Sequence, residues 1–157
     1  MAKSAPARKP PPKPSNREPD REPRTQFAAL PWRRNADGEV EVLLITSRET
    51  RRWVIPKGWP IKGLKSPQTA AREAFEEAGV EGEVAKKKIG VFHYDKRLRS
   101  GLLQKVRVGV YPLKVDIERQ DWPEAQQREK LWTTPQAAAD LVEESELSLI
   151  LRAFSPR

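Results

Sequence analysis

The chain has 157 residues, which is enough for one domain with a buried core. It carries 30 Lys and Arg against 22 Asp and Glu, a formal net charge of +8, so it favours anionic partners such as phosphorylated small molecules or nucleic acid. The absence of cysteine excludes disulfides, a thiolate nucleophile and a cysteine-based zinc site. No apolar run approaches the roughly 18 residues of a membrane helix, and no secretory signal is recognisable. We therefore expect a soluble cytoplasmic protein.

The first 24 residues differ in composition from the rest of the chain. They hold seven prolines, seven basic residues and three acidic residues, a net charge of +4, and no large apolar side chain after Met1. Such a segment cannot bury enough apolar surface to offset the entropy cost of ordering. The composition predicts a disordered basic tail at residues 1–24, followed by one domain at residues 25–157. The tail either improves solubility or tethers the domain to RNA or another polyanion.

From residue 25 onward, apolar alternation and turn signals predict both strands and helices. We expect a turn at residues 35–38, a charged loop at 95–101, a helix opened by Thr134 and Pro135, and an amphipathic helix at 145–154. The expected strands cover residues 26–32, 39–46, 53–55, 88–94, 105–115 and 130–132.

The most informative predicted helix covers residues 67–78. Ser66 can cap it, Pro67 suits its first position, and Gly79 can adopt the left-handed conformation that ends it. The helical period separates two faces. One is small and apolar and suits packing against a sheet, whereas the other is acidic and faces away from the core. The apolar face holds Ala71, Ala74, Phe75 and Ala78, and the acidic face holds Glu73, Glu76 and Glu77.

The acidic face is a candidate metal site. Glu73, Glu76 and Glu77 stand at positions i, i+3 and i+4, so their carboxylates project into one small volume and repel one another. A hard divalent cation reverses that repulsion, and carboxylates without nearby His or Cys suit Mg²⁺ or Mn²⁺ better than zinc. The alternative is a solvated acidic face partnered by Arg72 and nearby lysines. On the triplet alone, the solvated acidic face is the favoured interpretation.

The segment around this helix resembles the Nudix box. Residues 58–80 read GWPIKGLKSPQTAAREAFEEAGV, which follows the family pattern of Gly, five residues, Glu, seven residues, Arg-Glu-aliphatic-any-Glu-Glu-any-Gly-aliphatic. One position departs, because Leu64 stands where the family usually has Glu. The matching positions are Gly58, Arg72, Glu73, Glu76, Glu77, Gly79 and Val80, with Ala74 as a small apolar residue.

The resemblance implies an α/β fold, the Nudix alpha–beta–alpha sandwich with a mixed sheet between helices. It also implies that water attacks one phosphorus of a diphosphate linkage. On this basis Glu73, Glu76, Glu77 and the Gly58 carbonyl would hold Mg²⁺, with Mn²⁺ as an alternative.

Catalytic roles follow from the same resemblance. We assign Glu76, Glu77 and Arg72 as catalytic, with Arg72 orienting a box carboxylate. The general base is either Glu76 or an acidic residue of a later loop, and the spacing does not choose between them. The later candidates are Asp116, Glu118, Asp121 and Glu124.

The substrate assignment depends on residues outside the box. The stretch Arg52-Trp53-Val54-Ile55-Pro56-Lys57-Gly58 resembles the diphosphoinositol polyphosphate phosphohydrolase branch, which acts on diphosphoinositol polyphosphates and dinucleoside polyphosphates. A collar of cationic side chains suits such a phosphate-rich ligand. An RNA 5′-pyrophosphohydrolase and a non-catalytic nucleotide- or RNA-binding module are the alternatives. The predicted substrate-binding residues are Lys57, Arg52, Lys62, Arg97, Lys105 and Arg107.

Overall fold

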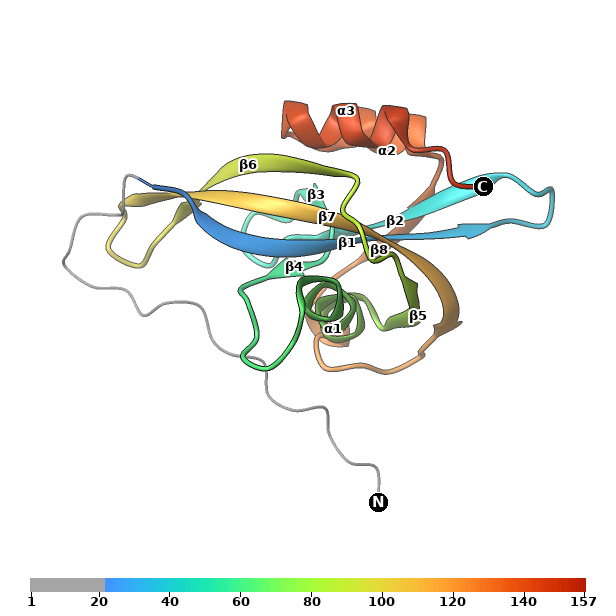
Figure 1. Ribbon diagram of the computed structural model, residues 1–157, viewed down its shortest axis with the longest axis horizontal. Coiled ribbons are helices and arrows are strands. Elements are labelled where there is room, and N and C mark those ends of the chain that lie inside the picture. The colour runs from blue at the N-terminus through green and yellow to red at the C-terminus, as the bar shows by residue number, and fades with distance from the viewer. Residues whose placement is uncertain (1–21) are drawn as a thin grey trace, which may run out of the picture.

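The computed structural model describes residues 22–157 and has a mixed β-sheet between two layers of helix (Figure 1). Helix α1 (Ser66–Ala78) covers one face, and α2 (Pro135–Leu141) with α3 (Ser145–Ala153) covers the other. The predicted alpha–beta–alpha architecture is thus confirmed. No helix in this described range is both long and apolar enough to cross a membrane. The predicted tail lies outside the described residues except for its last three positions.

Eight strands and a short 3-10 helix complete the fold. The 3-10 helix, η1, covers Ala125–Gln127. The strands are β1 (Arg24–Arg34), β2 (Val40–Thr46), β3 (Trp53–Val54), β4 (Lys57–Gly58), β5 (Val80–Val84), β6 (Gly90–Arg97), β7 (Leu103–Glu118) and β8 (Lys130–Thr133).

The centre of the sheet is the parallel pair of β1 and β7. Their register runs from Arg24 opposite Val106 to Trp32 opposite Lys114, and all other strand pairs are antiparallel. The long strand β7 pairs with β6 along its first half and with β5 along its second half. Strand β4 pairs with β1 directly before the loop that leads into α1. The sheet centre therefore fixes the start of the box segment.

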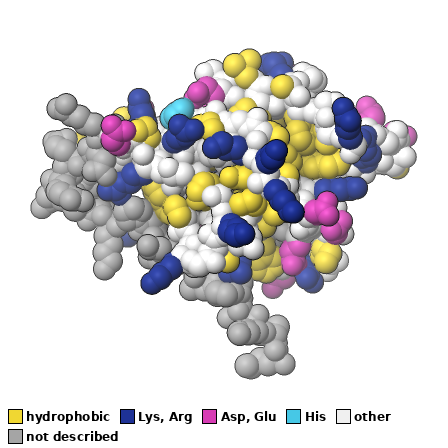
Figure 2. Space-filling model, viewed as in Figure 1, with side chains coloured by type: hydrophobic (Ala, Val, Ile, Leu, Met, Phe, Trp, Pro, Cys, Tyr) yellow, Lys and Arg dark blue, Asp and Glu magenta, His cyan; other side chains and the backbone are white. Residues whose placement is uncertain are grey.

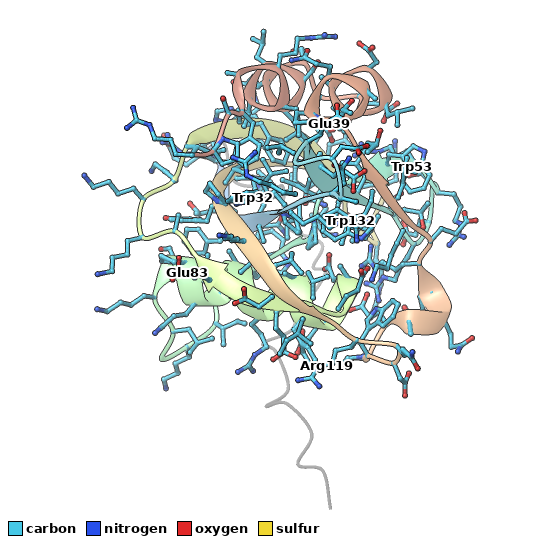
Figure 3. The ribbon with its side chains drawn as sticks, turned by 90° about the vertical axis from the view of Figure 1, so that its right-hand side faces the viewer. Trp32, Glu39, Trp53, Glu83, Arg119 and Trp132 are labelled. Carbon is cyan, nitrogen blue, oxygen red and sulfur yellow. The ribbon has the colours of Figure 1, made fainter. Side chains whose placement is uncertain are left out.

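Side chains that alternate along the strands pack into two apolar cores, one on each face of the sheet. Val106, Val108 and Val110 are fully buried in the core shared with Leu147 and Leu151 of α3. The core on the other face contains alanines from three successive turns of α1, which are Ala70, Ala74 and Ala78. Because alanine adds little bulk, α1 approaches the sheet closely. Figure 3 shows side chains packed between the sheet and the helices on either side of it.

The structure differs from the predicted elements in three places. The predicted charged loop at 95–101 is shorter, because β6 continues through Arg97 and pairs with β7. Helix α1 begins at Ser66 with Lys65 as its N-cap, and Gln68 Oε1 accepts a hydrogen bond from the Lys65 amide at 2.9 Å. Strand β5 was not predicted, because Gly and Glu are weak strand formers. It forms through pairing with β7, with an irregularity between Glu81 and Gly82.

Candidate active site

The C-terminus of α1 is fixed by the loop that follows β7. Gly79 takes φ 69°, and its amide donates to the Phe75 carbonyl at 3.0 Å. The Trp122 side chain packs directly over Gly79, and its Nε1 atom donates to the Glu77 carbonyl at 3.2 Å. The Glu124 amide donates to the Glu76 carbonyl at 3.0 Å. These contacts satisfy carbonyls of the last helical turn, so the loop of residues 119–129 helps to hold the box helix in place.

Substitution of Gly79 by alanine should therefore be costly. A Cβ atom there would lie 2.5 Å from the Trp122 ring, in addition to the strain of a positive φ. Gly38 is a matched control, because it has φ 81° and nothing within 4 Å of the added atom. We expect the free energy of unfolding in urea to fall by about 1 kcal/mol in Gly38→Ala and by about 2–4 kcal/mol in Gly79→Ala. Equal losses would show that the Trp122 contact contributes nothing.

The acidic face of α1 is buried, contrary to the expectation that it faces away from the packed interior. Glu73 is 0% exposed, Glu76 7% and Glu77 4%. The β4 strand and the loop of residues 119–129 cover this face. Buried carboxylates are expensive unless charge or hydrogen bonds compensate for the lost hydration. Such burial suits a functional site better than a solvated surface.

Gly58 and Glu73 approach each other closely. A Cβ atom at position 58 would lie 2.3 Å from the carboxylate carbon of Glu73, so no side chain larger than hydrogen fits without moving that carboxylate. This contact brings the backbone of β4 against the first acidic residue of the box. It explains why the sequence places glycine at this point.

The third acidic residue, Glu77, joins the helix to two other segments. Its Oε1 atom accepts a hydrogen bond from the Lys57 amide at 3.2 Å, and its Oε2 atom lies 3.5 Å from Nη2 of Arg128. Arg128 is itself buried and donates from Nη2 to Glu124 at 2.8 Å and from Nη1 to the Thr46 carbonyl at 3.1 Å. The carboxylate of Glu77 is thus held by a backbone amide and a fixed guanidinium.

The predicted convergence of the three carboxylates is not seen. Within residues 22–157, no group of three or more acidic or imidazole side chains is arranged to hold a metal ion. The side chain of Glu73 lies against Gly58, whereas that of Glu77 contacts the Lys57 amide and Arg128. All three nevertheless lie within two turns of one helix and offer only oxygen ligands. This donor set fits a hard divalent cation if the side chains rotate.

The later acidic residues occupy different environments. Glu124 is buried at 8% exposure and lies beside the box, bonded to Arg128. Asp116 and Asp121 are exposed. Burial disfavours the charged form of Glu118, but hydrogen bonds from Lys130 and Trp132 outweigh it and hold the pKa of that carboxyl below its usual range. Of the four candidate bases, the structure places Glu124 in direct contact with the box helix.

A cavity of about 370 Å³ opens beside Gly58 and Glu77. Of the predicted substrate-binding residues, Arg52, Lys57 and Arg97 line it. Further cations and aromatic residues also line it, and these are Arg48, Lys96, Arg128, Trp59 and Tyr94. Trp59 lies within the box, and Lys96 belongs to the predicted charged segment at 95–101. Arg128 comes from a segment far from the box in the chain, so no local spacing links it to the site.

The other three predicted substrate-binding residues, Lys62, Lys105 and Arg107, do not line this cavity. Lys105 and Arg107 are exposed and alternate along β7 with the buried residues Gln104, Val106 and Val108. Because side chains alternate along a strand, Lys105 and Arg107 point to the opposite face.

Lys57 directly precedes Gly58 of the box, and Glu77 is the carboxylate that acts most strongly on its ammonium group. Burial lowers its pKa to about 8, against the opposing effect of the Glu77 and Glu144 carboxylates. Its ammonium lies 4.9 Å from the centre of the Tyr94 ring. Burial also raises the pKa of Tyr94, whose hydroxyl donates to Gln26 at 2.7 Å. Anions entering this cavity would favour the protonated form of Lys57.

Comparison with known proteins identifies the family of the chain. A family profile described as the NUDIX domain matches residues 24–153. The chain is 34% identical over 108 residues to Nudix hydrolase 12, mitochondrial, of Arabidopsis thaliana, covering 66% of this chain and 52% of the relative. It is 34% identical over 91 residues to diphosphoinositol polyphosphate phosphohydrolase 3-beta of Homo sapiens, covering 57% and 51%. The chain thus spans about half the length of these curated relatives.

Solved structures share the fold at low sequence identity. The Escherichia coli dihydroneopterin triphosphate pyrophosphohydrolase has a TM-score of 0.62 at 17% identity, covering 83% of this chain and 93% of that one. A binary complex of a Caenorhabditis elegans Ap4A hydrolase has a TM-score of 0.60 at 22% identity, covering 82% and 92%. The matched box, the fold and the family profile together show that the chain belongs to the Nudix family.

Proposed function

We propose that this chain hydrolyses a phosphoanhydride bond in a dinucleoside polyphosphate or a diphosphoinositol polyphosphate, with Mg²⁺ as cofactor. The observation that carries the proposal is the shared wall of the cavity. Gly58 and Glu77 of the box line the same 370 Å³ space as Arg48, Arg52 and Lys57. A polyphosphate in this space would have its anhydride bonds beside the acidic helix and its remaining charge beside the cations.

Different residues would bind the metal ion, orient a carboxylate and accept a proton. Glu73, Glu76 and Glu77 with the Gly58 carbonyl would hold the cation, and Arg72 would orient a box carboxylate. When bound, Mg²⁺ supplies charge neutralisation for phosphate oxygens and a more acidic water. Two carboxylates are candidates to take the proton of the attacking water, namely Glu76 and Glu124. The attack would release two phosphate-containing products.

The surface charge supports an anionic substrate. Lys and Arg side chains cross the middle of the face drawn in Figure 2, whereas acidic side chains lie mostly toward its margins. A positive field of this kind draws anions toward the protein and raises association rates, with strong dependence on ionic strength.

The test is the formation of cleavage products, separated by anion-exchange chromatography, from a panel of substrates. Diadenosine polyphosphates, a diphosphoinositol polyphosphate, ADP-ribose, nucleoside triphosphates and 5′-triphosphorylated RNA would each be incubated with Mg²⁺ or with EDTA. We expect turnover of the first two with Mg²⁺ and none with EDTA. Turnover of RNA alone would replace the substrate assignment, and binding without any turnover would favour a non-catalytic module.

A further inference from the structure

A cluster of charged side chains lies beside the cavity, where the segment between α2 and α3 meets the residue before β3. Arg52, the residue before β3, lines the cavity. Its Nε atom lies 3.0 Å from Glu143 Oε2, and its Nη2 atom lies 2.8 Å from Glu144 Oε2. Two consecutive acidic residues thus hold two of the three guanidinium nitrogens. The remaining nitrogen, Nη1, is buried and donates no hydrogen bond to any atom of residues 22–157.

The two acidic residues differ sharply in burial. The Glu143 side chain is 70% exposed, whereas the Glu144 side chain is 9% exposed. Ion pairs in water contribute little, because solvent screens them and flexible side chains lose entropy on pairing. A buried carboxylate keeps one geometry and holds its partner much more firmly. Glu144, at the N-cap of α3, is therefore the residue that fixes the direction of the Arg52 side chain.

An unbonded guanidinium N–H has a clear chemical preference. A buried donor without an acceptor costs free energy, and a phosphate oxygen is among the strongest acceptors for arginine. Arg52 is already immobilised by the pair, so little further side-chain entropy would be lost when an anion arrives. The same residue lies in the cavity that contains Lys57 and Gly58, next to the box.

We propose that Glu144 is a positioning residue, which orients the Arg52 guanidinium so that its free Nη1 edge binds a phosphate group of the substrate. This inference rests on the proposed function, since it assumes a polyphosphate in the cavity. It assigns to the α2–α3 connection a part in substrate binding, although that segment is distant in sequence from the Nudix box.

The sign of the effect separates positioning from simple electrostatics. A carboxylate near a cationic cavity repels phosphates, so its removal would tighten binding if charge alone mattered. A positioning role predicts the opposite, because Arg52 would become mobile when its buried partner is lost. Glutamine at position 144 keeps an oxygen acceptor for Arg52 and should therefore preserve most of the binding.

Isothermal titration of inorganic tripolyphosphate into the full-length protein tests the idea without requiring turnover. We expect Glu144→Ala to weaken binding about tenfold, and Glu144→Gln about threefold or less. In the Arg52→Ala background, Glu144→Ala should cause no further loss, because the two residues act through one contact. Glu143→Ala is the matched control, since it removes the exposed neighbour, and it should change the Kd by less than about twofold.

Several results would overturn the proposal. One is that Glu144→Ala binds tripolyphosphate as tightly as the wild-type protein, or more tightly. Another is that Glu144→Ala weakens binding in the Arg52→Ala background as much as it does in the wild-type protein. Failure of the wild-type protein to bind tripolyphosphate would also do so. Thermal unfolding of each variant identifies any that fail to fold, and Glu144→Gln then supplies the comparison. Failure of the proposed function looks different, because Mg²⁺-dependent formation of cleavage products would be absent while the pattern of binding remained.

Discussion

Replacement of Glu76 by glutamine should lower kcat by at least about a hundredfold, in line with the loss of a metal ligand or a catalytic base. The side chain is 7% exposed and stands on the box helix between Glu73 and Glu77. Glutamine has nearly the same shape, so the packing of α1 should survive. Removal of one buried negative charge from this crowded face should not lower the thermal midpoint.

The comparison for this variant is Glu83→Gln, which changes an exposed glutamate on β5. Its kcat should match wild type, so any loss in Glu76→Gln reflects position rather than net charge. Both rates would be measured with saturating Mg²⁺ on the best substrate of the panel. Retention of full activity by a correctly folded Glu76→Gln protein would refute the assignment of this helix face as the catalytic centre.

The second large effect is expected from Gly58→Ala. The added methyl group would overlap the Glu73 carboxylate, whose nearest atom is 2.3 Å away. Because the obstacle is the end of a flexible side chain, the fold can adapt by turning Glu73 aside. That movement displaces a predicted metal ligand, and displacements of about 1 Å can cost up to about a hundredfold in rate. We therefore expect kcat to fall by about 10- to 100-fold, with little change in stability.

Gly109→Ala provides the control for this substitution. Gly58 and Gly109 both stand opposite Phe27, on β4 and β7 respectively. A Cβ atom at Gly109 would meet only ordinary contacts at 3.5 Å or more. Kinetics at varied Mg²⁺ concentration would compare the two variants. A Gly58→Ala enzyme with unchanged kcat and unchanged Mg²⁺ dependence would show that the position of Glu73 is not important for activity.

The box helix could be predicted from sequence because its information is local. Spacing places Glu73, Glu76 and Glu77 on one face, and Gly79 ends the helix in the left-handed conformation, as expected. The burial of that face could not be predicted. It depends on β4 and on the loop of residues 119–129, which close over the carboxylates from distant points in the chain.

Only some of the residues that line the cavity could be predicted, because the others come from distant parts of the chain. Lys57 lies directly before the box, so its place in the cavity follows from sequence proximity. Arg128 reaches the same space through contacts with Glu77 and Glu124, which no sequence spacing reveals. The alternation of Lys105 and Arg107 was correctly identified, since both are exposed between buried valines. Which side of the sheet carries Lys105 and Arg107 could not be predicted, because that depends on how the helices pack against the sheet.

The parallel pairing of β1 with β7 has a consequence for how the protein matures on the ribosome. The β1 residues from Arg24 to Trp32 pair with β7 residues about 80 positions later in the chain, as Arg24 pairs with Val106. The box helix is therefore synthesised before the central strand that completes its sheet. Distant pairing of this kind slows folding, because a long loop must close first. We expect a released truncated chain that ends before residue 103 to expose the α1 alanine face and to need chaperone protection, because it lacks Tyr111 and Leu113 of β7, which pack in the same core.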